Sequence, residues 1–157
     1  MRALVWIGEN TWEACVDQAR ALLPRQAAIT LLHVAAGDIE EVVAGARLAR
    51  LGRPPAPPRE PLDAVSAEEA RALLAAAQAR LGRPANLIAR RGRVEREVVA
   101  ACTDSDLLLL ARDGGDRVGP RSLGPRTRYV VDHAPCAVLL IWPRAPSAGS
   151  PVPRPRH

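Results

Sequence analysis

Five short apolar runs, spread over most of the chain, constrain its fold more than any other feature. They occupy residues 3–7, 27–34, 85–90, 107–111 and 136–142. Runs of this length are typical of strands buried on both faces, which occur almost only in parallel sheets. Segments with helical spacing of apolar residues lie between them, at 11–23, 66–81, 94–102 and 126–133. The alternation predicts an α/β domain, in which a five-stranded parallel sheet carries helices on both faces.

The helical segment at 66–81 has a start signal and a stop signal of its own. Ser66 and Glu69 have the spacing of a capping box, in which each side chain bonds to the other residue's backbone amide. Gly82 follows the last apolar position and is a common residue just beyond a helix end. These signals predict a helix that begins at Ser66 and ends before Gly82.

Length and composition indicate one folded domain and a tail. A chain of 157 residues is of single-domain size, and 48% of it is hydrophobic. Residues 1–143 contain all the apolar periodicity, so we predict that they form the domain. Residues 144–157 are mainly Pro, Ser and Arg, and a segment of this composition is predicted to be disordered.

The charge of the chain argues against a nucleic-acid partner. The net charge is +5, all 22 cations are Arg, and three of them lie in the tail, which leaves about +2 for residues 1–143. No aromatic platform or Arg-rich helix accompanies this charge. No apolar run reaches the roughly 18–20 residues of a membrane span. In the first ten residues one charge is followed by five apolar residues, and this apolar stretch is too short for a signal peptide. We predict a cytoplasmic protein that binds neither nucleic acid nor membrane.

Residue types that carry catalysis or bind metal are few. Cys15, Cys102 and Cys136 are widely spaced, lack metal-ligand spacing, and are predicted to be structural thiols. His33 closes an apolar run and His133 ends a helical segment, and both positions favour structural roles. The chain contains no nucleophile elbow, no zinc motif and no lysine for a P-loop. The sequence therefore predicts a protein that is not an enzyme and holds no metal.

Several stretches together resemble the universal stress protein family. They are LLHV at 31–34, the long insertion before residue 66, ARRGRVEREVVAAC followed by DSDLLLLA, two glycines at 114 and 124 with nine residues between them, and HAPCAVLLI at 133–141. The resemblance covers about residues 2–143. It implies the Rossmann-like fold of that family, a role in stress response, and an adenine-nucleotide site beside the fourth strand.

The resemblance also implies which residues form that site. Members that bind ATP carry Gly-x2-Gly-x9-Gly-Ser/Thr after the fourth strand and an Asp at the end of the first strand. Here the first glycine of the motif is Ala111, the Ser or Thr is Pro125, and the Asp is Gly8. The positions implied for the nucleotide are Gly8, Val34, Ala111, Gly114, Gly124, Pro125, Arg126 and Thr127.

Two of these differences from the ATP-binding motif remove polar contacts to a nucleotide. Gly8 supplies no carboxylate, and Pro125 supplies neither a hydroxyl nor an amide proton, although it suits the first position of a helix. The next amides, of Arg126 and Thr127, remain as donors at the helix start. Two lost contacts of about 1–3 kcal/mol each would weaken ATP binding by tens to thousands of fold. The sequence thus favours a degenerate site with weak or lost ATP binding. A chain that has lost the nucleotide would work through dimerisation or through contacts with a protein partner.

A second hypothesis for the site stays open. Five arginines lie in the loop and at the helix start, opposed by Asp113 and Asp116, and guanidinium groups bind phosphate in bidentate fashion. The chain would then be a sensor of ATP or of another anion. The arginines are Arg112, Arg117, Arg121, Arg126 and Arg128.

The last apolar run predicts a homodimer. It is too apolar for a free sheet edge, which would invite aggregation. In the universal stress protein family this strand commonly pairs with the same strand of a second copy, whereas cover by the insertion or the tail is the alternative. The predicted centre of the dimer interface is Val138, Leu139, Leu140, Ile141 and Trp142.

Overall fold

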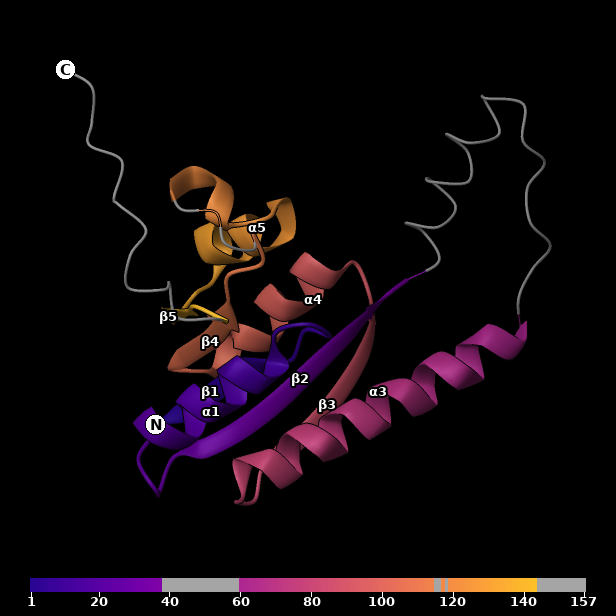
Figure 1. The fold of residues 1–157 in the computed structure, drawn as a ribbon, viewed down its shortest axis with the longest axis horizontal. Helices are drawn as coiled ribbons and strands as arrows, with labels where there is room; N and C mark the ends of the chain where they lie inside the picture. Colours follow the sequence, from indigo (N-terminus) through magenta and orange to yellow (C-terminus); the bar gives the residue numbers. More distant parts are fainter. Residues whose placement is uncertain (38–59, 115–116, 118, 144–157) are drawn as a thin grey trace.

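The computed structural model describes residues 1–37, 60–114, 117 and 119–143 (Figure 1). The insertion at 38–59 lies outside the described residues. So does the tail at 144–157, which the sequence predicts to be disordered. Within the described part, strands and helices alternate along the chain as the apolar runs predict.

All five predicted strands are present and form one parallel sheet. Its strand order is β3-β2-β1-β4-β5, so β1 lies at the centre and β3 and β5 form the edges. This confirms the predicted fold class. The strands are β1 (Arg2–Trp6), β2 (Ala28–Ala36), β3 (Asn86–Gly92), β4 (Leu107–Ala111) and β5 (Ala137–Ile141).

Helices cover both faces of the sheet. The helices are α1 (Trp12–Leu22), α3 (Glu60–Leu81), α4 (Val94–Ala101) and α5 (Pro125–His133), with short 3-10 turns at Cys102–Asp104 and Gly119–Ser122. Helices α1 and α3 share one buried apolar cluster with the sheet, while α4 and α5 share another. Figure 1 shows the long α3 lying beside β3 and β2, away from α4 and α5.

The predicted start of the helix at 66–81, which is α3 in the structure, is wrong. Helix α3 begins at Glu60, six residues before Ser66, so Ser66 and Glu69 lie inside it and do not form a capping box. Pro61 is the second residue of the helix, and proline suits the first turn because those amides have no partner within the helix. The Ser-x-x-Glu spacing is equally compatible with a helix interior, which is why the local signal misled.

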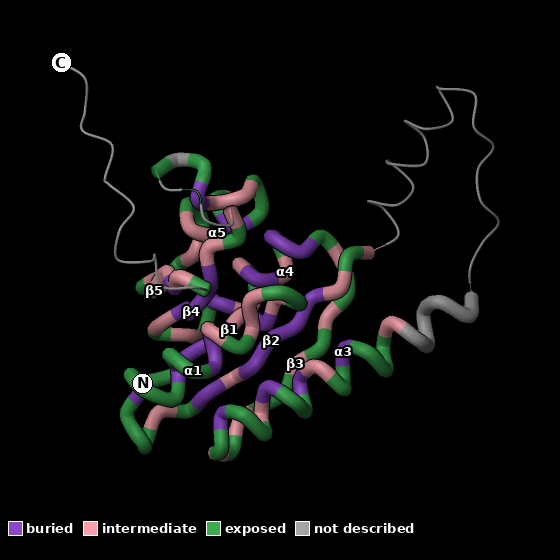
Figure 2. Tube along the Cα trace, in the orientation of Figure 1, coloured by how far each residue is buried: buried purple, intermediate pink, exposed green. Residues whose placement is uncertain are grey.

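Side-chain alternation along the central strands builds the two halves of the core. In β1, Val5 packs under α1 and α3, whereas Leu4 packs with α4 and α5. The same alternation holds in β4, where Leu109 and Leu108 point to opposite faces. Figure 2 shows β2 and β4 buried over most of their length. The apolar runs therefore mark strands that are covered on both sides.

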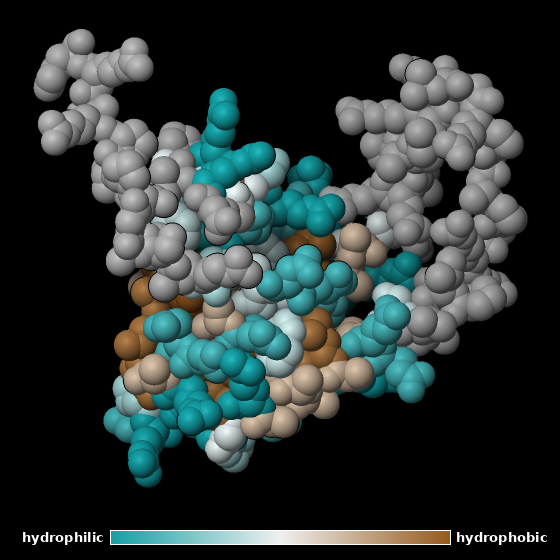
Figure 3. Space-filling view, in the orientation of Figure 1, coloured by the Kyte–Doolittle hydropathy of each residue, from teal (hydrophilic) through white to brown (hydrophobic). Residues whose placement is uncertain are grey.

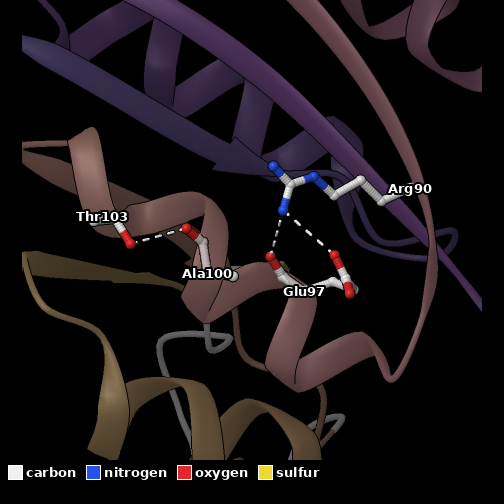
Figure 4. A network of polar contacts seen from close by, with 4 residues as sticks. All are labelled: Arg90, Glu97, Ala100 and Thr103. Atoms are coloured by element: carbon white, nitrogen blue, oxygen red, sulfur yellow. Dashed lines mark hydrogen bonds and ion pairs between the residues drawn. The ribbon is translucent and has the colours of Figure 1, made fainter.

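The edge strand β3 is polar and exposed by comparison. Arg90 projects from β3 toward α4, where its Nη1 lies 3.3 Å from Glu97 Oε2 and 3.5 Å from the Glu97 carbonyl oxygen (Figure 4). On the same helix end, the Thr103 hydroxyl donates to the Ala100 carbonyl at 3.0 Å. The Arg90 contacts hold α4 against the β3 side of the sheet, whereas the Thr103 bond is local to the end of α4.

The amino-terminal edge of the sheet is closed by Asp106. Its Oδ2 accepts a hydrogen bond from the Arg2 amide at 2.6 Å, just before β4 begins. The Asp104–Asp106 turn thus lies on the sheet edge opposite the carboxyl ends of the strands. Within the described ranges, the structure contains no helix that is long and apolar enough to cross a membrane.

We predict that Leu109→Ala lowers the free energy of unfolding by about 2–5 kcal/mol, because it leaves a cavity in the fully buried centre of the sheet. The control is Leu22→Ala at a residue that is 58% exposed, which should change stability by less than about 0.5 kcal/mol. Urea unfolding of both variants measures the difference. Equal effects would contradict the assignment of the core.

Candidate functional site

The strand order creates one crevice at the carboxyl edge of the sheet. After β1 the chain moves outward to β2 and β3, and it then crosses back to β4 on the other side of β1. The helix that follows β1 therefore lies on one face, and the helix that follows β4 lies on the other. Ligands of open α/β sheets bind where the strand order reverses in this way.

A cavity of about 780 Å³ lies at this reversal point. Its walls come from the turn after β1, the ends of β2 and β4, the inner face of α3, and the starts of α4 and α5. The lining residues are Trp6, Ile7, Gly8, Glu9, Asn10, Thr11, His33, Val34, Ala35, Ala36, Ser66, Glu69, Ala70, Leu73, Val94, Ala111, Asp113, Arg126 and Thr127.

The cavity brings together five of the eight residues that the sequence implies for a nucleotide site. Gly8, Val34, Ala111, Arg126 and Thr127 all line it, although they come from four different elements and turns. The other three lie in the loop and helix start beside the cavity and do not line it. These three are Gly114, Gly124 and Pro125.

The turn after β1 is built around Gly8. Its carbonyl accepts hydrogen bonds from the Thr11 amide at 3.1 Å and the Trp12 amide at 3.0 Å, which starts α1. A Cβ added at Gly8 would lie 3.1 Å from Thr11 Oγ1, the end of a side chain that can turn away. The position therefore has room for a side chain, and its glycine leaves the cavity without a carboxylate there.

His33 has a structural role at the cavity wall. Its Nδ1 lies 2.9 Å from the Ile7 carbonyl oxygen, and the side chain is buried. Because a carbonyl oxygen only accepts, Nδ1 carries the proton. The bond joins the ends of β1 and β2, and it confirms the prediction that His33 is a satisfied core histidine.

The sequence indicated Asp113 only as a charge that opposes the loop arginines, but the structure gives its carboxylate two hydrogen-bond donors at this site. Its Oδ1 accepts a hydrogen bond from the Gly124 amide at 2.6 Å, and its Oδ2 accepts one from the Thr127 hydroxyl at 2.8 Å. A carboxylate thus lies at the start of α5, where the helix dipole favours negative charge. No sequence signal indicates this contact, since the loop between the partners sets their approach.

Gly114 and Gly124 let the two sides of the loop pack closely against each other. A Cβ at Gly114 would lie 2.3 Å from the Arg121 carbonyl oxygen, and one at Gly124 would lie 2.5 Å from Asp113 Oδ2. The Gly114 amide also donates to the Ser122 carbonyl at 3.0 Å. The two glycines therefore close the base of the loop.

Arg112 points to the end of β5. Its amide donates to the Ile141 carbonyl at 2.8 Å, its guanidinium donates to Ser122 Oγ, and its guanidinium carbon lies 4.6 Å from the ring centre of Trp142. The Ser122 hydroxyl in turn donates to the Gly119 carbonyl at 2.7 Å. Arg112 does not line the cavity, because these contacts direct it elsewhere.

Arg126 does line the cavity, and a buried carboxylate lies near it. Burial alone would raise the pKa of Glu95, but bonds from its own amide and from Arg93, with the charges of Arg93 and Arg126, lower it. Arg93 Nε lies 2.7 Å from Glu95 Oε1. The described lining also carries the carboxylates Glu9, Glu69 and Asp113. Its electrostatic character is therefore acidic.

The cysteines lie apart from the cavity. Cys15 and Cys102 are buried, and Cys136 is half-buried. Burial raises the pKa of the Cys15 thiol to about 12, and burial with the nearby Cys136 thiol does the same for Cys102. A thiol with so high a pKa forms little nucleophilic thiolate at neutral pH. Among the residues described, no group of three or more His, Cys, Asp or Glu side chains has a metal-binding arrangement.

We predict that Gly114→Ala destabilises the protein by about 1–3 kcal/mol, because the new methyl group overlaps the Arg121 carbonyl oxygen. Gly8→Ala is the matched control, since its methyl group meets only the movable Thr11 side chain. Thermal unfolding in the absence of ligand measures both. A loss of similar size for the two variants would contradict the self-packed loop.

Comparisons with known proteins identify the fold. No family model matches the sequence, and no curated protein matches it. Solved structures do match. A universal stress protein in complex with cAMP has a TM-score of 0.60 and 16% identity, covering 92% of this chain and 98% of that one.

Two further matches extend over similar lengths. A universal stress protein from Lactobacillus plantarum has a TM-score of 0.55 and 19% identity, covering 90% of this chain and 97% of its own. A family member from Arabidopsis thaliana with AMP bound has a TM-score of 0.54 and 18% identity, covering 96% and 97%. The chain therefore has the α/β fold of the universal stress proteins.

Proposed function

We propose that the chain is a binding module of the universal stress protein type, with a degenerate adenine-nucleotide site that binds ATP weakly or not at all. The cavity at the reversal of strand order carries this proposal. It gathers Val34, Ala111 and Thr127, three of the positions that the family resemblance implies for a nucleotide. At their own positions, Gly8 supplies no carboxylate and Pro125 supplies no hydroxyl.

The size of the cavity and two structural neighbours support an adenine-containing ligand class. A volume of about 780 Å³ falls within the range of roughly 300–1,000 Å³ for small-molecule pockets. Two of the neighbours hold cAMP and AMP, respectively. Among the described residues, the lining includes apolar side chains from both core clusters, Ile7 from one and Val34 and Val94 from the other, and mostly apolar lining is typical of small-molecule pockets.

Binding, and not catalysis, is the proposed activity in a cytoplasmic stress response. The imidazole of His33 is engaged by the Ile7 carbonyl, so its Nδ1 proton already has an acceptor in the fold. The buried thiols Cys15 and Cys102 carry strongly raised pKa values. The Nδ1–H bond of His33 joins parts of the fold, and the two buried thiols form little nucleophilic thiolate at neutral pH.

The alternative function is a sensor of ATP or another anion that uses the loop arginines. One observation favours it: Arg126 borders the cavity. Arg112 does not support it, because its guanidinium is directed to Ser122 and Trp142. In this alternative Arg126 would supply the main attraction for phosphate.

Calorimetric titration with ATP and magnesium tests the proposed function. We expect no heat of binding at micromolar ATP and a Kd in the millimolar range or beyond, because two polar contacts are missing. Arg126→Gln should then change little. Micromolar binding that Arg126→Gln abolishes would overturn the proposal in favour of the anion sensor.

We propose in addition that the chain forms a homodimer through β5. This edge strand has half-buried Val138, Leu139 and Leu140, and its outer backbone groups have no neighbouring strand among the described residues. A groove of about 640 Å³ borders it, lined in part by Leu139, Leu140 and Trp142. Figure 3 shows apolar surface gathered at this side of the molecule.

Light scattering after size exclusion tests the dimer. We expect twice the mass of one chain for the unaltered protein and a single-chain mass for Leu139→Glu, because the charge would be buried in the interface. Leu87→Glu is the control, since Leu87 is 38% exposed on β3, the opposite edge. Dimers that persist in Leu139→Glu, or that vanish equally in the control, would contradict pairing through β5.

A further inference from the structure

The start of α5 already holds an anion that belongs to the chain. The two oxygens of Asp113 each accept one hydrogen bond, from the Gly124 amide at 2.6 Å and from the Thr127 hydroxyl at 2.8 Å. An amide and a hydroxyl at a helix start are the donors that bind phosphate in nucleotide sites. Both are engaged here before any ligand arrives.

Asp113 reaches these donors from another element. It follows the end of β4, lines the cavity, and lies eleven residues before Gly124 in the sequence. The approach depends on Gly124, because a Cβ there would lie 2.5 Å from Asp113 Oδ2. The glycine that would admit a phosphate in a nucleotide loop thus admits a carboxylate of the protein.

The surrounding charges reinforce the effect of Asp113. Glu9 and Glu69 line the same cavity, so a phosphate that enters meets further negative charge. The cation on the lining, Arg126, lies near Glu95 and lowers the pKa of that carboxyl group. Part of its field is therefore directed at the protein's own carboxylate.

We propose that Asp113 determines the ligand class of the cavity: its carboxylate occupies the phosphate position, so the cavity discriminates against nucleotides in favour of the uncharged nucleoside. This inference rests on the proposed function, since it assumes an adenine-type ligand. It goes further in assigning the weak binding of ATP to an occupied subsite. Missing contacts at Gly8 and Pro125 alone would leave that subsite open.

The experiment compares adenosine with ATP on the same variants by calorimetry. The readout is the ratio of the two dissociation constants, because changes in the base or ribose contacts affect both ligands alike. Asp113→Asn removes the charge and keeps the shape, and Asp113→Ala exposes both donors. We expect Asp113→Ala to improve ATP affinity relative to adenosine by about 10- to 100-fold, because the phosphate gains hydrogen bonds to the freed donors. Asp113→Asn should improve the ratio by less, because it removes the repulsion while the side chain still occupies the position.

Two control variants make the test specific. Asp132→Asn removes the same charge from an exposed position on α5 and should leave the ratio unchanged. The double variant Gly8→Asp and Pro125→Ser restores the missing groups but leaves Asp113 in place, so the ratio should again change little. Circular dichroism of all variants establishes that α5 and the sheet remain folded.

The outcomes separate this inference from the proposed function. A ratio that stays unchanged in both Asp113 variants, or ATP binding that neither shows, overturns the role of Asp113 and leaves the proposed function intact. Recovery of ATP binding in the double variant alone overturns it as well. Micromolar ATP binding by the unaltered protein overturns the proposed function, whatever the variants do.

Discussion

Burial of β1 and β4 on both faces is the constraint on which the rest of the structure depends. Leu4 and Val5 in β1, and Leu108 and Leu109 in β4, are at most 1% exposed, so each strand needs a helix above and below it. Parallel neighbours can be joined only through crossovers, and these crossovers supply the helices. Since β1 and β4 are adjacent but lead to helices on opposite faces, the cavity between them follows from the way the core is covered.

The amino and carboxyl ends of the strands consequently have different roles. At the amino edge, Asp106 bonds to the Arg2 amide and closes the turn before β4 with exposed polar groups. At the carboxyl end of the sheet, the turns after β1 and β4 lead to helices on opposite faces and leave a cavity of about 780 Å³. His33 stabilises this end of the sheet by a side-chain bond to the Ile7 carbonyl, just after β1 ends.

The sequence predicted the sheet well because strand burial is a local property of composition. A run such as LLLL at 107–110 needs cover on both faces wherever it lies in the fold. Helix α3 was predicted less well, because Ser66 and Glu69 suit a helix start and a helix interior equally. At the site, the resemblance to a family located Gly8, Val34 and Ala111 in the cavity lining.

The contacts of Asp113 could not be predicted, for a physical reason. Its partners are 11 and 14 residues away across a loop without periodicity, and the approach is a matter of tertiary geometry. The same sequence reasoning treated Asp113 only as a charge opposing the arginines. Hydrophobic pattern reports which side chains are buried, but it contains no information on which donor a loop carboxylate meets.

The loop after β4 is closed at its base by hydrogen bonds between its two ends. Asp113 and Gly114 on one side are bonded to Gly124 and Ser122 on the other, so the geometry of the helix start is fixed by the base itself. Lengthening a closed loop costs little entropy, because the cost grows only with the logarithm of its length. The position of the α5 start is therefore set by the two ends of the loop, and the length of chain that joins them adds little to the entropic cost of closing it.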